Sequence, residues 1–94
     1  MRIWYQQPII IPHQPEDVEI MLCGIMNECD GSKSLIEIQL VADDQVLILY
    51  SHNPTMRFAE EPTDDELIAK YNAKLVRLRL KAQKTDFSKL FPSV

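Results

Sequence analysis

The sequence of 94 residues has only two glycines and two cysteines, and no apolar run is long enough to cross a bilayer. A glycine-rich phosphate-binding loop is therefore absent. Cys23 and Cys29 match neither a zinc ribbon nor a disulfide scaffold, so we expect two reduced thiols. The start of the chain, MRIWYQQPIII, lacks the pattern of a secretory signal peptide. These features predict a cytoplasmic protein without a membrane partner.

Residues that could carry catalysis are also scarce. The only histidines, His13 and His52, lie in predicted loops, and neither has a second ligand type at metal-binding spacing. The acidic pairs at Asp43–Asp44 and Asp64–Asp65 suit a turn and a helix start, which need no catalytic role. The sequence therefore predicts no catalytic residue, no metal site and no cofactor. We expect a protein that is not an enzyme.

The composition is that of a folded domain. Apolar residues make up 46% and charged residues 26% of the chain, which is typical of a globular protein and not of a disordered one. Two separate cores would each be too small to be stable alone. We expect a single domain over residues 1–94.

Charge is divided unequally along the chain. Residues 70–94 contain seven of the ten basic residues and one acid, a net charge of +6, whereas residues 1–69 carry −10. The total is −4. A basic segment on an acidic body indicates an anionic partner, a self-complementary assembly or neutralisation within the fold.

The N-terminal segment is predicted to be a short edge strand over residues 1–6, because Pro8 has no amide hydrogen for a central strand. Ile9, Ile10 and Ile11 follow between two prolines and could form a small extra strand. Three consecutive side chains cannot all face one side of a strand. At least one of them should point to the opposite face or into a partner.

Residues 15–29 are predicted to form a helix. Pro15, Glu16 and Asp17 suit a first helical turn, and Asp30–Gly31 would end the helix. At 100° per residue, one face of this helix is apolar. It comprises Val18, Met21, Leu22, Ile25, Met26 and Cys29. The alternative is a strand, which is favoured by Gly24 and by two apolar residues, Ile20 and Cys23, that lie off this face.

The middle of the chain predicts two strands, residues 34–41 and 46–51, joined by a turn at Asp43–Asp44. The first strand alternates apolar and polar residues, so it should have one buried face. The second strand is apolar on both faces. A strand of this kind is either central in a sheet or packed beneath something further. A loop should follow over residues 51–62, since Asn53–Pro54 favours a turn.

A long helix is predicted from Asp64 to Lys84. Thr63 and Glu66 form a capping-box pattern, and acids at the start with lysines at the end complement the helix dipole. A short turn through Phe87, Leu90 and Phe91 should dock the tail on the body. The side of the long helix that packs on the sheet is predicted to be Leu67, Ile68, Tyr71, Leu75, Leu78 and Ala82.

Two other strips of this helix are candidate binding surfaces. The first, the basic stripe, is Lys70, Lys74, Arg77, Lys81 and Lys84. It either binds an anionic partner or is a solvated face that pairs with acids such as Asp43, Asp44 and Glu60. The second, the seam, is Ala69, Ala73, Val76 and Leu80. Its spacing suits a helix pair in a homodimer, unless the first helix or the tail covers it.

The expected fold is α+β, a three- to four-stranded sheet in the order βαββα with the long C-terminal helix packed on it. The expected function is that of a small regulatory or adaptor protein that acts by binding another protein, as a monomer or a homodimer. Its candidate partner-binding residues are the basic stripe, Val76 and Leu80 of the seam, and Ile9, Ile10 and Ile11. The alternative is a nucleic-acid-binding protein that uses the basic stripe.

Overall fold

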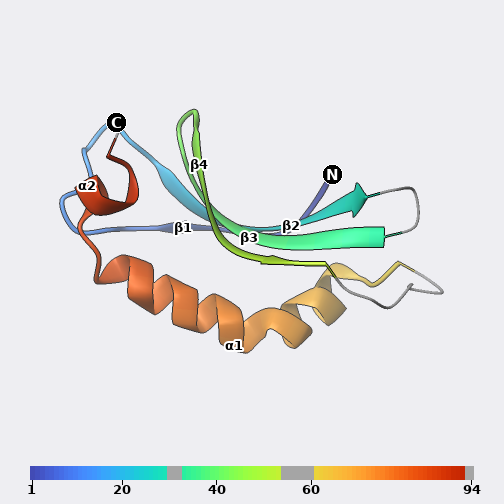
Figure 1. Ribbon diagram of the computed structural model, residues 1–94. Helices are drawn as coiled ribbons and strands as arrows, with labels where there is room; N and C mark the ends of the chain where they lie inside the picture. Colours follow the sequence, from blue (N-terminus) through green and yellow to red (C-terminus); the bar gives the residue numbers. More distant parts are fainter. Residues whose placement is uncertain (30–32, 54–60, 93–94) are drawn as a thin grey trace.

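Four strands come first in the chain and two helices follow, in a computed structural model that describes residues 1–29, 33–53 and 61–92 (Figure 1). The elements are β1 (Arg2–Ile9), β2 (Ile20–Cys29), β3 (Lys33–Ala42), β4 (Gln45–His52), α1 (Asp64–Gln83) and α2 (Phe87–Leu90). The strands form one antiparallel sheet in the order β1-β2-β3-β4. α1 runs along one face of this sheet (Figure 1). The predicted α+β class, with a sheet of this size and a long C-terminal helix, is confirmed.

Alternate residues of the two central strands build the core with α1. In β2 and β3 these are Ile20, Leu22, Met26, Ile36, Ile38, Leu40 and Ala42, all buried in one cluster with the helix. The strands are paired in register, with Leu22 opposite Leu40 and Met26 opposite Ile36. Because successive side chains of a strand point to opposite faces, the residues between them belong to the other face of the sheet.

The predicted helix over residues 15–29 is wrong, since most of this segment is β2. Residues before it form a turn in which the Val18 amide donates to the Pro15 carbonyl, 3.1 Å away. In the strand Leu22 faces the core and Ile25 faces the other side, although a helix would place both on one face. A segment that is apolar on both faces satisfies either period. The pairing of β2 with its two neighbouring strands therefore decides its structure. The predicted helix end at Asp30–Gly31 lies outside the described residues.

β1 is an edge strand, as predicted, but it continues through Pro8 to Ile9. The missing amide hydrogen of Pro8 does no harm at an edge. Ile9 and Ile11 are buried in the core, whereas Ile10 is 80% exposed. The expectation that these three side chains divide between two sides is confirmed.

Gly24 makes room for the single tryptophan of the chain. A Cβ atom at position 24 would lie 2.6 Å from the indole ring of Trp4, much closer than real Cβ contacts allow. The Trp4 ring is buried and lies 5.8 Å from the Tyr71 ring of α1. β1 is irregular at this position, where its register shifts between Ile3 and Tyr5. Glycine at position 24 thus allows an indole ring to fill the space between sheet and helix.

α1 begins as the sequence predicts. Thr63 and Glu66 form the capping box, with the Thr63 hydroxyl oxygen accepting the Glu66 amide at 3.2 Å. The predicted packing side of the helix is confirmed, with Leu67, Tyr71, Leu75 and Ala82 buried and Ile68 and Leu78 partly buried against the core. The helix is also held to the edge strand, because the Arg79 guanidinium donates to the Tyr5 hydroxyl.

The tail folds back as the predicted short turn, and Asp86 anchors it. Phe87 and Phe91 are buried with ring centroids 5.3 Å apart, and the Phe87 amide donates to the Pro12 carbonyl. Asp86 Oδ1 accepts the hydroxyl and the amide of Ser88, and Oδ2 lies 2.7 Å from His13 Nδ1. These hydrogen bonds, that of the Ser88 hydroxyl first, lower the pKa of Asp86 from 3.8 to about 2.

Replacing Gly24 by alanine should lower the free energy of unfolding by about 1–3 kcal/mol, since the added methyl group must displace the Trp4 ring or the backbone. Denaturant unfolding of wild type and Gly24→Ala measures the difference. Gln39→Ala, a truncation on the other face of β3, is the control and should change stability by less than about 0.5 kcal/mol. A Gly24→Ala variant as stable as wild type would contradict the close packing.

The Asp86 carboxylate should stabilise the protein only above the acid range. Its pKa is lower in the folded state, so the stabilisation is complete above pH 4 or so and is lost as the pH falls through about 2. We therefore expect Asp86→Ala to melt at a lower temperature than wild type at pH 7, with most of the difference lost at pH 2. Glu19→Ala, at an exposed carboxylate, is the control for thermal melts across this range. An equal difference at both pH values would show that the charge of Asp86 contributes nothing.

Candidate functional site

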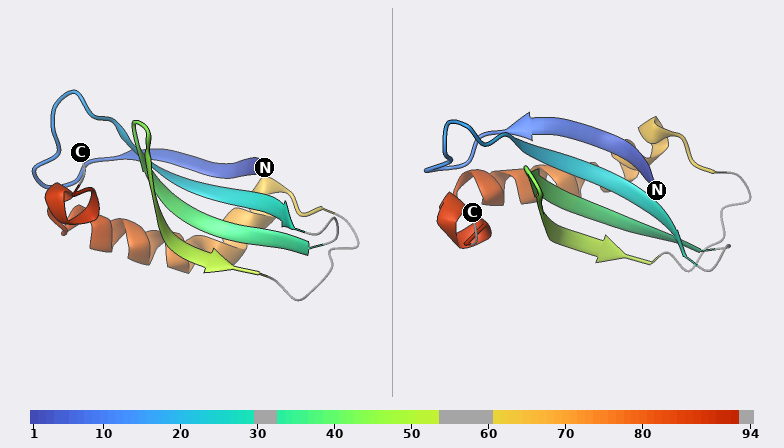
Figure 2. Two further views of the ribbon diagram at one scale, coloured as in Figure 1. Left: turned by 45° about the horizontal axis from the view of Figure 1, so that its top comes forward. Right: turned by 90° about the horizontal axis from the view of Figure 1, so that it is seen from above.

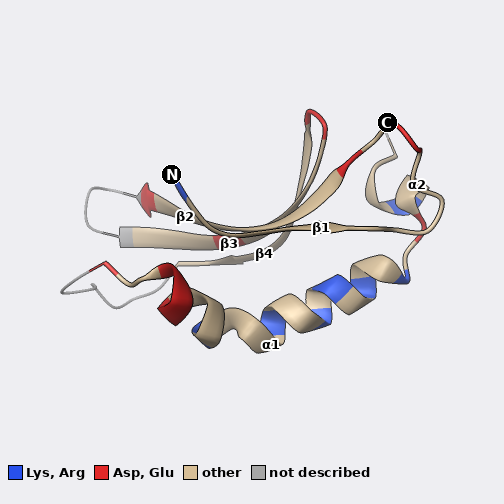
Figure 3. Ribbon diagram, turned by 180° about the vertical axis from the view of Figure 1, so that it is seen from behind, with Lys and Arg blue, Asp and Glu red and all other residues tan. Residues whose placement is uncertain are grey.

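The basic stripe lies along α1, with Lys84 capping the C-terminal end of the helix (Figure 3). Lys70, Arg77, Lys81 and Lys84 are exposed, and Lys74 is half-buried. The acids of the helix are confined to its first turn, so the charged residues of the rest of α1 are all basic (Figure 3). The structure therefore brings all five predicted residues together on one element.

The basic stripe makes no ion pair with any acid in the described part of the chain. Two of its ammonium groups rest on aromatic rings: Lys74 Nζ lies 4.6 Å from the Tyr50 ring centroid and Lys70 Nζ lies 5.7 Å from that of Tyr71. Such contacts are worth about 0.5–1 kcal/mol at exposed sites. The ion pairs of this region belong to Arg2, which binds Glu61 and Asp64 at the start of α1.

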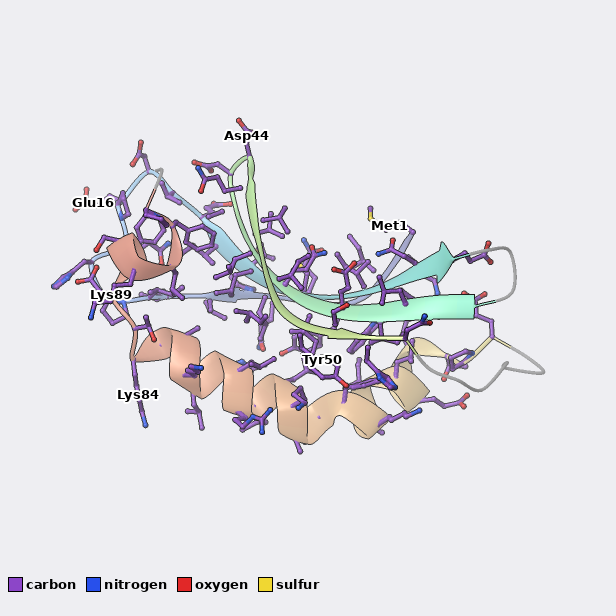
Figure 4. The ribbon with its side chains drawn as sticks, viewed as in Figure 1. Met1, Glu16, Asp44, Tyr50, Lys84 and Lys89 are labelled. Atoms are coloured by element: carbon purple, nitrogen blue, oxygen red, sulfur yellow. The ribbon has the colours of Figure 1, made fainter. Side chains whose placement is uncertain are left out.

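The predicted pairing of the stripe with Asp43 and Asp44 does not occur, because these acids form the β3–β4 turn on the far side of the sheet from α1 (Figure 4). The third predicted acid, Glu60, lies outside the described residues. A turn at Asp43–Asp44 was itself predicted, and Asp43 adopts the left-handed backbone conformation with φ of 50°. Neutralisation of the stripe by this turn is therefore excluded.

The seam is uncovered. Ala69 and Ala73 are exposed, Val76 is 41% exposed and Leu80 is 50% exposed. The predicted cover by a first helix fails because that segment is β2, and α2 leaves Val76 and Leu80 open. Seam and basic stripe are adjacent on the helix, so apolar and positively charged groups share one outward surface.

Fewer of the three consecutive isoleucines are available to bind a partner than the sequence predicted. Ile9 and Ile11 belong to the core, so they are not available to a partner. Ile10 alone is exposed, beside a shallow hollow lined by Pro8, Gln14 and Met21. A single apolar side chain of this kind is common on protein surfaces.

The sequence analysis missed a larger surface, the face of the sheet opposite α1, which we call the open face. Its apolar members come from all four strands. They are Ile3, Met21, Cys23, Ile25, Leu35, Val41, Val46 and Ile48. None of them belongs to the core cluster, and Val46 and Ile48 are 55% and 53% exposed. Seen from above, no described helix crosses this face (Figure 2).

The open face also carries acidic residues. Cys23 and Ile25 of β2 are buried on this face, although no described helix crosses it (Figure 2). Glu37 is buried there too, and its carboxylate accepts a hydrogen bond from Asn27 at 2.9 Å. The Asp43–Asp44 turn rises on the same side (Figure 4). The open face thus combines apolar residues with carboxylates.

One signal in the sequence pointed to this face. The strand beginning at Val46 is apolar on both sides, which predicted a central position or cover by something further. The first alternative is wrong, since β4 is an edge strand. Val46 and Ile48 lie on the open face, whereas Leu47 packs against the core. Val46 and Ile48 of β4 are therefore candidates for contact with a partner.

The remaining candidates for chemistry stay apart from one another. His13 lies in a turn and contacts Asp86, whereas His52 is the last residue of β4, not part of a loop as predicted. Cys23 is a free thiol, and burial raises its pKa. In the described residues no three His, Cys, Asp or Glu side chains are grouped to hold a metal ion. No described helix has the length and apolar character to span a membrane.

Comparisons with known proteins do not add to this description, since no family model, no curated protein and no solved structure matches the chain. Two surfaces of the described chain are therefore the candidates for a functional contact. One is the outward face of α1, formed by the seam and the basic stripe. The other is the open face of the sheet.

The thiol of Cys23 should react slowly with iodoacetamide, because burial lowers access and the raised pKa lowers the thiolate fraction. The experiment uses a Cys29→Ser variant, so that Cys23 is the only thiol. We expect slow alkylation at pH 8 in the folded protein and rapid alkylation in denaturant, both followed by mass spectrometry. Equal rates in the two states would show that the Cys23 thiol on the open face is accessible to the reagent.

Proposed function

We propose that this chain is a non-enzymatic adaptor or regulator that works by binding another protein through the outward face of α1. The observation that carries the proposal is the exposure of Val76 and Leu80 beside a basic stripe that has no ion pair in the described residues. An apolar centre beside polar, solvent-accessible groups is the usual arrangement of a protein interface.

The cost of the basic stripe supports this proposal. Like charges three or four residues apart destabilise a helix by about 0.2–0.5 kcal/mol per pair. Ring contacts of Lys70 and Lys74 offset part of this cost, but Arg77, Lys81 and Lys84 make no such contact in the described structure. An acidic protein surface would convert the repulsion into attraction and would also cover Leu80.

Nucleic-acid binding through the same stripe is the second candidate, because five cations at helical pitch match a row of phosphates. Two features favour a protein partner instead. The rest of the chain is strongly acidic and would repel a polyanion. Tyr50 and Tyr71 lie beneath lysines or in the core, so they do not form an open platform for stacking bases.

A cytoplasmic location is part of this proposal. Cys23 is a free thiol in the described structure, and free buried thiols are typical of proteins in a reducing compartment. The proposal includes no cofactor, no metal and no catalytic residue.

Affinity capture with matched variants tests the proposal. A Leu80→Glu/Arg77→Glu variant should lose the proteins that wild type retains, since it places two acids in the proposed contact. Asn72→Glu adds one acid to the polar side of the same helix and should retain them. Retained proteins are identified by mass spectrometry, and each interaction is then measured with the purified protein.

Two further measurements, the salt dependence of partner binding and a nucleic-acid binding assay, complete the test. Binding to the purified partner should weaken about ten-fold or less between 0.1 and 0.5 M salt, because an apolar centre is insensitive to salt. Labelled duplex DNA and single-stranded RNA should show no binding at 0.15 M salt. Binding that the Leu80→Glu/Arg77→Glu variant retains, or tight salt-sensitive binding to either nucleic acid, would refute the proposal.

A further inference from the structure

We infer that a second copy of this chain is a partner for α1, and that the outward face of α1 in one copy docks on the open face of the sheet in the next. The inference rests on the proposed function, since it names the partner of the same helix face. No described helix covers the open face, and most residues of the seam and the basic stripe are exposed (Figure 2). The helix face carries cations and the open face carries carboxylates.

Charge complementarity is the first argument for this pairing. Glu37 lies on the open face, and the β3–β4 turn, where Asp44 is labelled, rises on the same side of the sheet (Figure 4). The helix offers the basic stripe beside an apolar seam (Figure 3). A docked helix would place the seam on the apolar residues of the open face and the cations of the basic stripe toward the carboxylates. The long stems of the lysines would add apolar contact, because lysine buries its methylene groups and keeps its ammonium in water.

The dimensions of the two surfaces also agree. A helix of 20 residues is about 30 Å long at 1.5 Å per residue. The two central strands have 10 residues each, which span about 33 Å. α1 already lies along its own sheet in this way on the other side (Figure 1). Docking on a second sheet would repeat the same packing, with α1 between two sheets.

Symmetric pairing of two helices would be opposed by charge. In an antiparallel pair related by a two-fold axis, both basic stripes lie on the same side of the contact. In a parallel pair the acidic first turns, which begin at Asp64, come together instead. Like charges that face each other across a contact cost free energy and suppress that association.

Symmetric pairing of two open faces has the same difficulty. It would bring Glu37 and the Asp43–Asp44 turn of both copies into one interface. Of the arrangements that cover these surfaces with a second copy, only helix on sheet joins opposite charges. The contact is therefore heterologous, with different surfaces of the two partners in contact.

The position of the two surfaces decides the form of the assembly. α1 and the open face lie on opposite sides of the molecule (Figures 1 and 2). Two copies can form one helix-on-sheet contact, but each then retains one uncovered surface for a further copy. Association should therefore continue beyond the dimer as the concentration rises.

Two variants block the two surfaces separately. Leu80→Glu places an acid on the helix face, opposite the carboxylates of the sheet, and Ile48→Lys places a cation on the open face, opposite the basic stripe. Both positions are about half-exposed, so both variants should fold, which circular dichroism verifies. Asn72→Glu, on the polar side of α1, is the control for the added charge.

Light scattering on wild type should give a mass that rises with concentration above that of a dimer, and Asn72→Glu should behave in the same way. Each blocked variant alone should be monomeric, with association weakened about ten-fold or more. An equimolar mixture of the two should associate again. In that mixture one intact helix face meets one intact open face.

Other outcomes would overturn the inference in distinguishable ways. A monomeric wild type at high concentration would exclude self-association, but capture of another protein that depends on Leu80 would leave the proposed function standing. Self-association that survives Leu80→Glu would show that two open faces pair. Self-association that survives Ile48→Lys would show that two helices pair. A mixture that stays monomeric would show that helix and sheet do not bind each other.

Discussion

The structure depends on one constraint: a single long helix can cover only one face of a four-stranded sheet. Leu67, Leu75 and Tyr71 of α1 close the face formed by the inward residues of β2 and β3. No second described helix is available for the other face, since the segment before β2 forms turns and α2 has only four residues. Apolar residues of the open face such as Val46 and Ile48 therefore remain exposed to solvent, and no described element covers the outer side of α1 either.

Local signals predicted the parts of the fold that local chemistry determines. Thr63 and Glu66 located the start of α1, and Asp43–Asp44 located the turn between β3 and β4. β2 was mistaken for a helix because it is apolar on both faces, so its spacing fits a helical face as well as a strand. Its conformation is decided by hydrogen bonds to β1 and β3, which no short window of sequence contains.

The candidate site was predictable to the same extent. The basic stripe and the seam follow from helical spacing alone, and both lie on the predicted strips of α1. The open face required knowledge of which strands are neighbours, because it is assembled from residues as distant as Ile3 and Ile48. Ile9 and Ile11 show the opposite error. An apolar run that looked available in the sequence is mostly core, because the chain turns back toward α2 after β1.

Trp4 gives the protein an optical property of its own. It is the only tryptophan of the chain, its indole is buried against Gly24 and Tyr71, and its Nε1 has no hydrogen-bond partner in the described structure. Emission from an indole in such apolar surroundings lies at shorter wavelength than emission from an indole in water. Because the ring belongs to an edge strand, the wavelength of its fluorescence emission reports whether β1 is paired with the sheet. The measurement needs no added label and leaves both outer surfaces unchanged.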